Sequence, residues 1–234
     1  MDDKSYSYLD RNVGEIRKKI KIAAARAGRD EKDILLMSAV KSAEADEINY
    51  IHKALGVSHI GENRVQQLLE RWDKLDKKGM TVHFIGSLQT NKVKYIIDKV
   101  DLIHSLDSER LAAEIDKQAK KHSLIANVLV EINSGNEESK GGIEYGDAEE
   151  FCKSLAKYDN IKLCGFMTMA PKCEKKEEYC KYFSKTYQLV LDIWTKKLHN
   201  IDVPVISMGM SESYEEAILE GSNLIRVGRT LFVK

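Results

Sequence analysis

Proline is scarce in this sequence of 234 residues: it contains only Pro171 and Pro204, and no serine- or glycine-rich linker. Neither a domain boundary nor a low-complexity segment is indicated, so we expect residues 1–234 to form a single domain. The apolar stretches are also short, and one of the longest, residues 125–130, is broken by Asn127. Because a membrane-spanning helix needs about 20 apolar residues, no association with a membrane is expected.

An excess of charge of either sign is absent too, since 37 Lys and Arg residues balance 37 Asp and Glu residues. A neutral chain lacks the broad positive field of non-specific nucleic-acid binding, so no nucleic-acid partner is expected. The N-terminus has no apolar segment typical of a secretory signal. No C-x-x-C pair occurs among the cysteines, which are Cys152, Cys164, Cys173 and Cys180. We therefore expect a cytoplasmic protein with reduced thiols.

Short apolar runs alternate with longer segments of helical periodicity, which indicates an α/β protein. A charged helix over about Tyr8–Ala27 comes first. The expected strands are Ile34–Val40, Val57–Ile60, Val82–Ile85, Leu102–His104, Ala126–Ile132, Lys162–Phe166, Val205–Met208 and Leu224–Val227. The expected helices between them are Ala45–Leu55, Val65–Leu75, Asn91–Lys99, Ser108–Lys121, Asp147–Lys157, Lys175–Leu198 and Ser213–Glu220. Ser213 and Glu216 have the spacing of a helix capping box.

Eight such units fit either an open doubly wound sheet or a closed (β/α)8 barrel. Neither the Rossmann string G-x-G-x-x-G nor the P-loop string G-x-x-x-x-G-K-[ST] occurs. The number of strands favours a single (β/α)8 TIM-type barrel with an extra N-terminal helix. In such barrels the chemistry lies just beyond the C-terminal ends of the strands. Polar residues and glycines gather there in this sequence, as a binding face requires, although ordinary turns would enrich the same types.

Lys41 directly follows the first expected strand, at the end of the run L-L-M-S-A-V-K. A lysine at the rim of a barrel is commonly just a solvated charge. The alternative is a nucleophile that forms a Schiff base with an aldehyde, which requires a lowered amine pKa. Lys92 and Lys140 are the basic neighbours that could lower it.

Ser211 and Gly228 follow the seventh and eighth expected strands, where barrels commonly bind phosphate. A serine hydroxyl can donate a hydrogen bond to an anion, and a glycine lets the backbone approach it closely. A helix-capping serine and a turn glycine explain the same two residues. A lysine after the first strand favours the phosphate interpretation, because a nucleophilic lysine and a phosphate site together suit a phosphorylated aldehyde.

The histidines show no metal-ligand spacing, so we expect no metal site. His83 and His104 fall in or at the ends of expected strands, and we expect them to be hydrogen-bonded core residues.

A resemblance covers about residues 10–232. It lies in segments that run in order along the chain: L-L-M-S-A-V-K, G-E-N-R-V-Q, H-F-I-G-S-L-Q-T-N-K, I-N-S-G-N-E-E-S-K-G-G, M-G-M-S and I-R-V-G-R. On these motifs the sequence resembles the pyridoxal 5′-phosphate (PLP) homeostasis protein family, single-barrel PLP-binding proteins related to the N-terminal domain of alanine racemase.

The resemblance implies that PLP is the cofactor and that Lys41 holds it as a Schiff base. It implies that Arg226 faces the pyridine nitrogen and disfavours its protonation, which would make PLP a weaker electron sink. The phosphate would then lie against Ser211, Gly228 and the backbone of Arg229. The remaining positions that match the family's pocket are Asn63, Ser105, Asn133 and Met167, with Lys140 at its rim.

Two departures from the family concern the loops. Arg229 stands where a small hydroxyl residue is common, so its side chain either reaches the phosphate or points to solvent. The proline usual shortly after the lysine is missing from K-S-A-E-A, which affects the rigidity of that loop.

The sequence shows no second, β-rich domain of the kind that alanine racemases carry, so the cofactor face is expected to be open to solvent and to lack a second general base. We therefore expect a non-enzymatic monomer that carries PLP within the cell, affects amino-acid metabolism and contacts apo PLP enzymes transiently. The alternatives are a weak PLP-dependent amino-acid racemase and a barrel that binds another phosphorylated metabolite.

Overall fold

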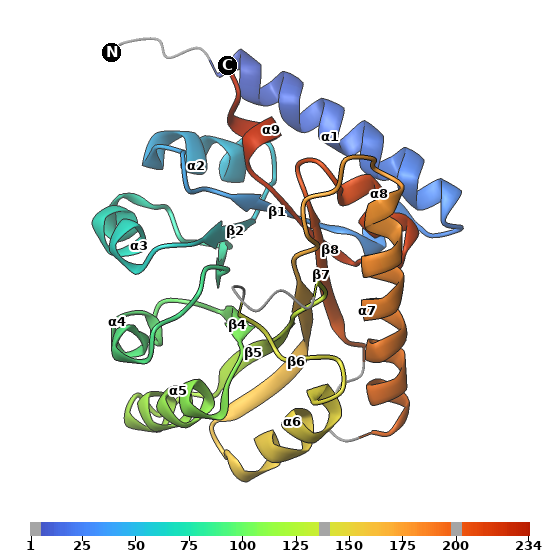
Figure 1. Ribbon diagram of the computed structural model, residues 1–234. Helices are drawn as coiled ribbons and strands as arrows, with labels where there is room; N and C mark the ends of the chain where they lie inside the picture. Colours follow the sequence, from blue (N-terminus) through green and yellow to red (C-terminus); the bar gives the residue numbers. More distant parts are fainter. Residues whose placement is uncertain (1–5, 136–140, 198–202) are drawn as a thin grey trace.

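The computed structural model describes residues 6–135, 141–197 and 203–234, which form one closed parallel barrel surrounded by helices (Figure 1). The strands follow the barrel in chain order and are β1 Leu35–Ala39, β2 His59–Glu62, β3 Thr81–Phe84, β4 Leu102–Leu106, β5 Ala126–Ile132, β6 Ile161–Thr168, β7 Val205–Met210 and β8 Leu224–Val227. Pairing of β1 with β8 closes the barrel and places Met37 opposite Arg226. The expected (β/α)8 barrel is confirmed.

The helices are α1 Ser7–Arg26, α2 Ala45–Lys53, α3 Val65–Arg71, α4 Val93–Ile96, α5 Glu109–Lys121, α6 Ala148–Ser154, α7 Glu178–Thr195, α8 Tyr214–Leu219 and α9 Arg229–Phe232. None of these helices, within the described part of the chain, combines the length and the apolar character needed to cross a bilayer.

Strand β5 shows how residues are divided between the two faces of the barrel wall. Val128, Val130 and Ile132 belong to the main apolar cluster formed with the surrounding helices, and Leu129 packs inside the barrel with Met167. Because both faces are buried, the strand reads as an almost continuous apolar run, as is typical of parallel sheets. Glu131, on the inward face with Leu129, interrupts that run.

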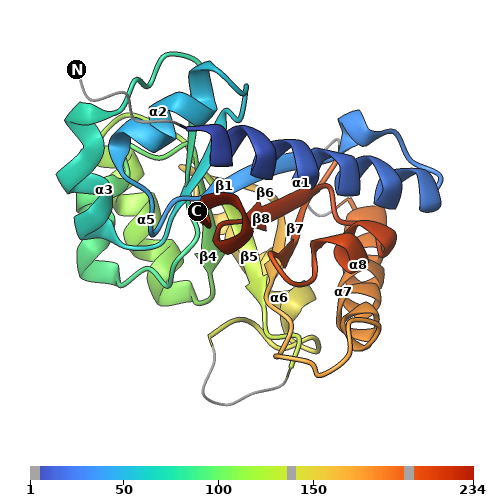
Figure 2. The same ribbon diagram turned by 90° about the horizontal axis from the view of Figure 1, so that it is seen from above.

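Helix α1 lies across the outside of the barrel beside α8 and α9 (Figures 1 and 2). Its apolar side chains, including Leu9, Val13 and Ile16, form a second cluster that contains Ile225 and Leu231. Asn12 also donates hydrogen bonds to the carbonyls of Leu231 and Val233, at 3.0 and 2.7 Å. The expected N-terminal helix therefore covers the seam where β8 meets β1 and fixes the C-terminal segment.

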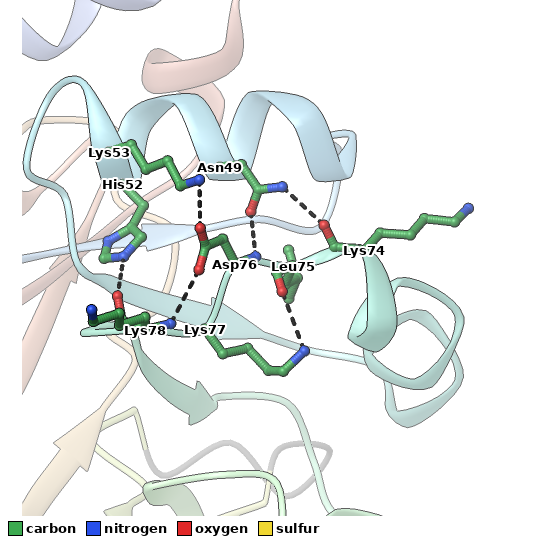
Figure 3. A network of polar contacts seen from close by, with 8 residues as sticks. All are labelled: Asn49, His52, Lys53, Lys74, Leu75, Asp76, Lys77 and Lys78. Carbon is green, nitrogen blue, oxygen red and sulfur yellow. Dashed lines mark hydrogen bonds and ion pairs between the residues drawn. The ribbon is translucent and has the colours of Figure 1, made fainter.

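A polar network ties α2 to the connection that leads into β3 (Figure 3). The side chain of Asn49 donates to the carbonyl of Lys74 at 2.9 Å and accepts from the backbone N–H of Asp76 at 2.8 Å. His52 contacts the carbonyl of Lys78 at 3.0 Å, and Lys53 pairs with Asp76. The network satisfies backbone groups of residues 74–78, of which 75–78 lie outside helices and strands.

Several expected boundaries were wrong by a few residues. Strand β4 continues past His104 to Leu106 through an irregular register, and β6 continues to Thr168. Helix α7 begins at Glu178, later than expected, while Leu198, where it was expected to end, lies outside the described residues. The predicted capping box is also wrong: Ser213 precedes α8, but its hydroxyl accepts from the N–H of Met210 instead of from the helix.

Candidate functional site

Two adjoining cavities of about 330 and 360 Å³ open at the C-terminal ends of the strands. Both are lined by Ala39, Lys41, Met169, Met210 and Arg226. We call the first the acidic lobe, because Asp107 and Glu131 line it, and the second the serine lobe, because Ser211 and Ser213 line it. Lys41 and Arg226 thus face both lobes of one site.

Lys41 lies two residues beyond the end of β1, after Val40, and its side chain is exposed at the mouth of the barrel. The end of that strand is held by Arg71, whose Nη1 donates to the carbonyl of Val40 at 2.8 Å and to Oε1 of Glu62 at 3.1 Å. Burial raises the pKa of the Glu62 carboxyl, and Arg71 opposes that rise. The result is a fixed backbone under a lysine that is free to reach into the cavities.

Arg226 enters the site from β8 and is only 4% exposed. Its Nη1 donates to the carbonyl and the hydroxyl of Ser207 at 2.7 and 2.6 Å, and its Nη2 donates to the carbonyl of Thr168 at 2.9 Å. Burial lowers the pKa of the guanidinium to about 10, while Glu131 opposes this shift. Arg226 therefore remains a cation at neutral pH, at the floor of the cavities.

Ser211 gathers two backbone donors in the serine lobe. Its hydroxyl accepts from the N–H of Gly228 at 3.3 Å and from the N–H of Thr230 at 3.4 Å. A Cβ atom on Gly228 would lie 2.7 Å from the carbonyl oxygen of Ala39, so the close approach of the two strand ends requires glycine here. The lobe thus offers N–H groups and a hydroxyl within a small space, the donor set that suits a phosphate group.

The guanidinium of Arg229 pairs with the carboxylate of Glu212, and both side chains are exposed at the rim of the serine lobe. Of the two orientations left open by the sequence, the structure shows the outward one. The backbone of residue 229 remains part of the loop around Ser211.

The acidic lobe contains two carboxyl groups that the sequence analysis missed. Glu131 is 8% exposed, and burial together with the charge of Asp107 raises its pKa to about 7, against the opposing effect of Arg226. A signal for Glu131 was present, because a lone carboxylate in an apolar strand shares the face of Leu129 and Asn133 by the two-residue alternation. Asp107 was missed because β4 was expected to end at His104.

The remaining predicted pocket residues divide into two groups. Asn63 and Asn133 line the acidic lobe, and the buried Oδ1 of Asn63 has no hydrogen-bond partner among the described residues. Ser105 and Met167 line neither lobe. They are buried inside β4 and β6, because both strands are longer than expected and carry these positions below the mouth.

The two lysines considered as neighbours of Lys41 are not part of the described site. Lys140 lies outside the described residues. Lys92 is half-buried in the segment before α4, where its amine lies 5.8 Å from the centre of the Tyr95 ring, and it lines neither lobe.

His83 and His104 are buried and hydrogen-bonded inside the barrel, which confirms the expectation of core residues. Within the part of the chain that the structure describes, no group of three or more His, Cys, Asp or Glu residues is arranged to hold a metal ion.

Fold and site together define a (β/α)8-barrel protein with a lysine after its first strand and an arginine on its last. The family model described as "Alanine racemase, N-terminal domain" matches residues 12–234. A protein of Aquifex aeolicus named "Pyridoxal phosphate homeostasis protein" is 40% identical over 220 residues, which cover 94% of this chain and 95% of that protein. The chain therefore belongs to the pyridoxal phosphate homeostasis protein family, within the wider alanine racemase N-terminal domain family.

Solved structures agree with this assignment. An unknown protein from Bifidobacterium adolescentis is 30% identical, with a TM-score of 0.92, and the match covers 99% of this chain and 97% of that one. PipY of Synechococcus elongatus, solved with PLP bound, is 26% identical, with a TM-score of 0.76, and the match covers 93% of this chain and all of PipY.

Proposed function

We propose that this protein binds PLP at the mouth of its barrel, holds it as a Schiff base on Lys41 and acts in PLP homeostasis. One observation carries the proposal: Lys41 and Arg226 line the same two cavities, and one of these also contains the donors at Ser211 and Gly228. The names of the curated relatives and the PLP-bound PipY structure support it.

The residues of the two lobes fit the chemistry of PLP part by part. The phosphate is assigned to the serine lobe, with the hydroxyl of Ser211 and the N–H groups of Gly228 and Thr230 as donors. Met169 and Met210, which are 39% and 42% exposed, offer apolar surface for an aromatic ring between the lobes. The amine of Lys41 is the nucleophile for the aldehyde.

Arg226 determines what the bound cofactor can do. PLP supplies an electron sink when its ring nitrogen is protonated. A guanidinium has only hydrogen-bond donors, so Arg226 beside that nitrogen would keep it unprotonated and the sink weak. This favours carriage of the cofactor over turnover, and we assign no enzymatic activity to the protein.

We further propose that the protein works as a cytoplasmic monomer that exchanges PLP with apo PLP enzymes through transient contacts. Within the described residues, which include all four cysteines, no disulfide is formed, and this agrees with a reducing compartment. The open lobes leave Lys41 accessible to an incoming amine, as exchange of the cofactor requires.

The absorption spectrum of the purified protein with added PLP tests the proposal. We expect a Schiff-base band in the wild type and in Lys92→Ala, whose lysine lies outside the lobes, and no such band in Lys41→Ala. A band of equal strength in Lys41→Ala would reject Lys41 as the attachment site. The absence of any band in the wild type would reject PLP as the ligand.

A further inference from the structure

A continuous chain of hydrogen bonds crosses the interior of the barrel from Arg226 to its opposite end. We call His59, His83, His104 and Ser207 the histidine column. Nδ1 of His59 lies 3.0 Å from Nε2 of His83, and Nδ1 of His83 lies 2.9 Å from Nε2 of His104. Nδ1 of His104 lies 3.1 Å from the hydroxyl of Ser207, which is 2.6 Å from Nη1 of Arg226.

The imidazoles of the column are neutral at physiological pH. Burial lowers the pKa of His83 to about 3, with a smaller contribution from His59, and it lowers the pKa of His104 and His59 as well. A neutral imidazole has one N–H donor and one nitrogen acceptor. Each ring therefore donates on one side and accepts on the other. Hence all hydrogen bonds of the column must donate in the same direction, either toward Arg226 or away from it.

Arg226 selects between these two donor directions, because a guanidinium can only donate. The Ser207 hydroxyl accepts from Arg226 and is itself 0% exposed. No second acceptor for its hydrogen, besides Nδ1 of His104, lies within hydrogen-bond distance in the described part of the chain. Ser207 therefore donates to His104, since a buried hydroxyl whose hydrogen has no acceptor destabilises the folded state.

The remaining donors follow in sequence. Nδ1 of His104 accepts from Ser207, so Nε2–H of His104 donates to Nδ1 of His83. Nε2–H of His83 then donates to Nδ1 of His59. The free Nε2–H belongs to His59, the first residue of β2, which is half-buried and lines a cavity of about 420 Å³ at the N-terminal end of the barrel. The nearby carboxylate of Asp101 favours a donor at this end.

We propose that the histidine column is a one-way hydrogen-bond chain in which His59, His83 and His104 are all Nε2–H tautomers, and that its residues are positioning residues for Arg226. The column holds the Ser207 hydroxyl as an acceptor for Nη1 and so fixes the guanidinium at the floor of both lobes. The effect of the column on the cofactor rests on the proposed function, whereas the assignment of the tautomers does not depend on it.

Nitrogen-15 NMR of the histidine side chains in PLP-free protein tests the tautomers directly. We expect three neutral rings with the proton on Nε2 at neutral pH, assigned to His59, His83 and His104. Protons on Nδ1, or a charged ring within the column, would overturn the proposal. Because this measurement needs no PLP and no variant, failure of PLP binding leaves it intact.

Ser207→Ala separates Arg226 from the column, and Ser222→Ala removes another fully buried hydroxyl, in the connection between α8 and β8, as a matched control. We expect Ser207→Ala to release the His104 tautomer and to shift the pH at which the PLP absorption band changes by about one unit. Ser222→Ala should move neither quantity, and Ser207→Thr should restore both. If Ser207→Ala altered the tautomer but left the pH profile of the band unchanged, the role in positioning Arg226 would be rejected.

Discussion

Glu131 places a carboxyl group in the same cavity as Lys41 and Arg226, so the mouth of the barrel combines both signs of charge at close range. The raised pKa of Glu131 means that a proton remains on this group under conditions in which an exposed glutamate is ionised. A site of this kind can exchange a proton near neutral pH without a histidine.

The stability of the PLP-free protein should reflect this shift. Since the pKa of Glu131 is about 7 in the folded state and 4.5 is its ordinary value, the folded state binds more protons between these limits. The contribution of Glu131 to the free energy of unfolding therefore falls as pH rises from about 4.5 to 7, by about 3 kcal/mol in total. Glu131→Gln should match the wild type near pH 4.5 and exceed it in stability by up to that amount at pH 8.

Urea unfolding at pH 4.5 and pH 8 measures the effect. Glu150→Gln, which changes an exposed carboxylate, is the control and should leave the free energy of unfolding unchanged at both pH values. A difference between Glu131→Gln and the wild type that did not vary with pH would contradict the assigned shift.

Ser211 provides the second prediction at this scale. Ser211→Ala removes the hydroxyl assigned to the phosphate, and a hydrogen bond to a charged group contributes about 1.5–3 kcal/mol. We expect PLP to bind at least about tenfold more weakly, as measured by titration of the absorption band. Pyridoxal, which lacks the phosphate, serves as the matched ligand and should lose little. An equal loss of affinity for both ligands would contradict the assignment of the phosphate to the serine lobe.

At the scale of the elements, the sequence was most informative where one periodicity dominated. Strands β5 and β8 were predicted with their observed limits, because the ends of an apolar run bounded by turns or helices are visible in the sequence. The sequence also predicted which residues meet at the mouth, namely Lys41, Arg226, Ser211 and Gly228, since each follows or lies in a recognisable strand.

Other features depend on contacts between strands that no local pattern contains. The register between β4 and β5 is irregular, and β4 continues through Ser105 to Leu106, which places Ser105 below the mouth. The histidine column joins residues from β2, β3, β4 and β7, so its bonds arise only when the barrel closes. Likewise, the Ser213 hydroxyl prefers the Met210 N–H to the helix that the capping-box pattern predicted.

The connection between α2 and β3 offers a test of how such tertiary contacts stabilise an element (Figure 3). Asn49→Ala removes two hydrogen bonds to the backbone of residues 74 and 76, and we expect it to lower the free energy of unfolding by about 1–2 kcal/mol. Lys53→Ala removes only an exposed ion pair with Asp76 and should cost less than about 1 kcal/mol. Urea denaturation distinguishes the two; an equal loss for both variants would contradict the role given to Asn49.

For the whole molecule, barrel closure brings the site together from the two ends of the chain. Lys41 lies just beyond β1, whereas Ser211, Arg226 and Gly228 come from the last quarter of the sequence. Helix α1 covers the seam between these parts and is packed against α8 and α9 (Figure 2). Binding at the mouth is thus coupled to the integrity of the entire barrel.

The covalent position of PLP tests the central claim most directly, because this lysine-rich chain has many amines that could react with an aldehyde. The protein is incubated with PLP, reduced with borohydride, digested and analysed by mass spectrometry. We predict that the reduced adduct lies on the peptide containing Lys41 and is lost in Lys41→Ala. An adduct spread over surface lysines would contradict the account, as would one concentrated on Lys92 or on Lys172, a lysine that lines the serine lobe.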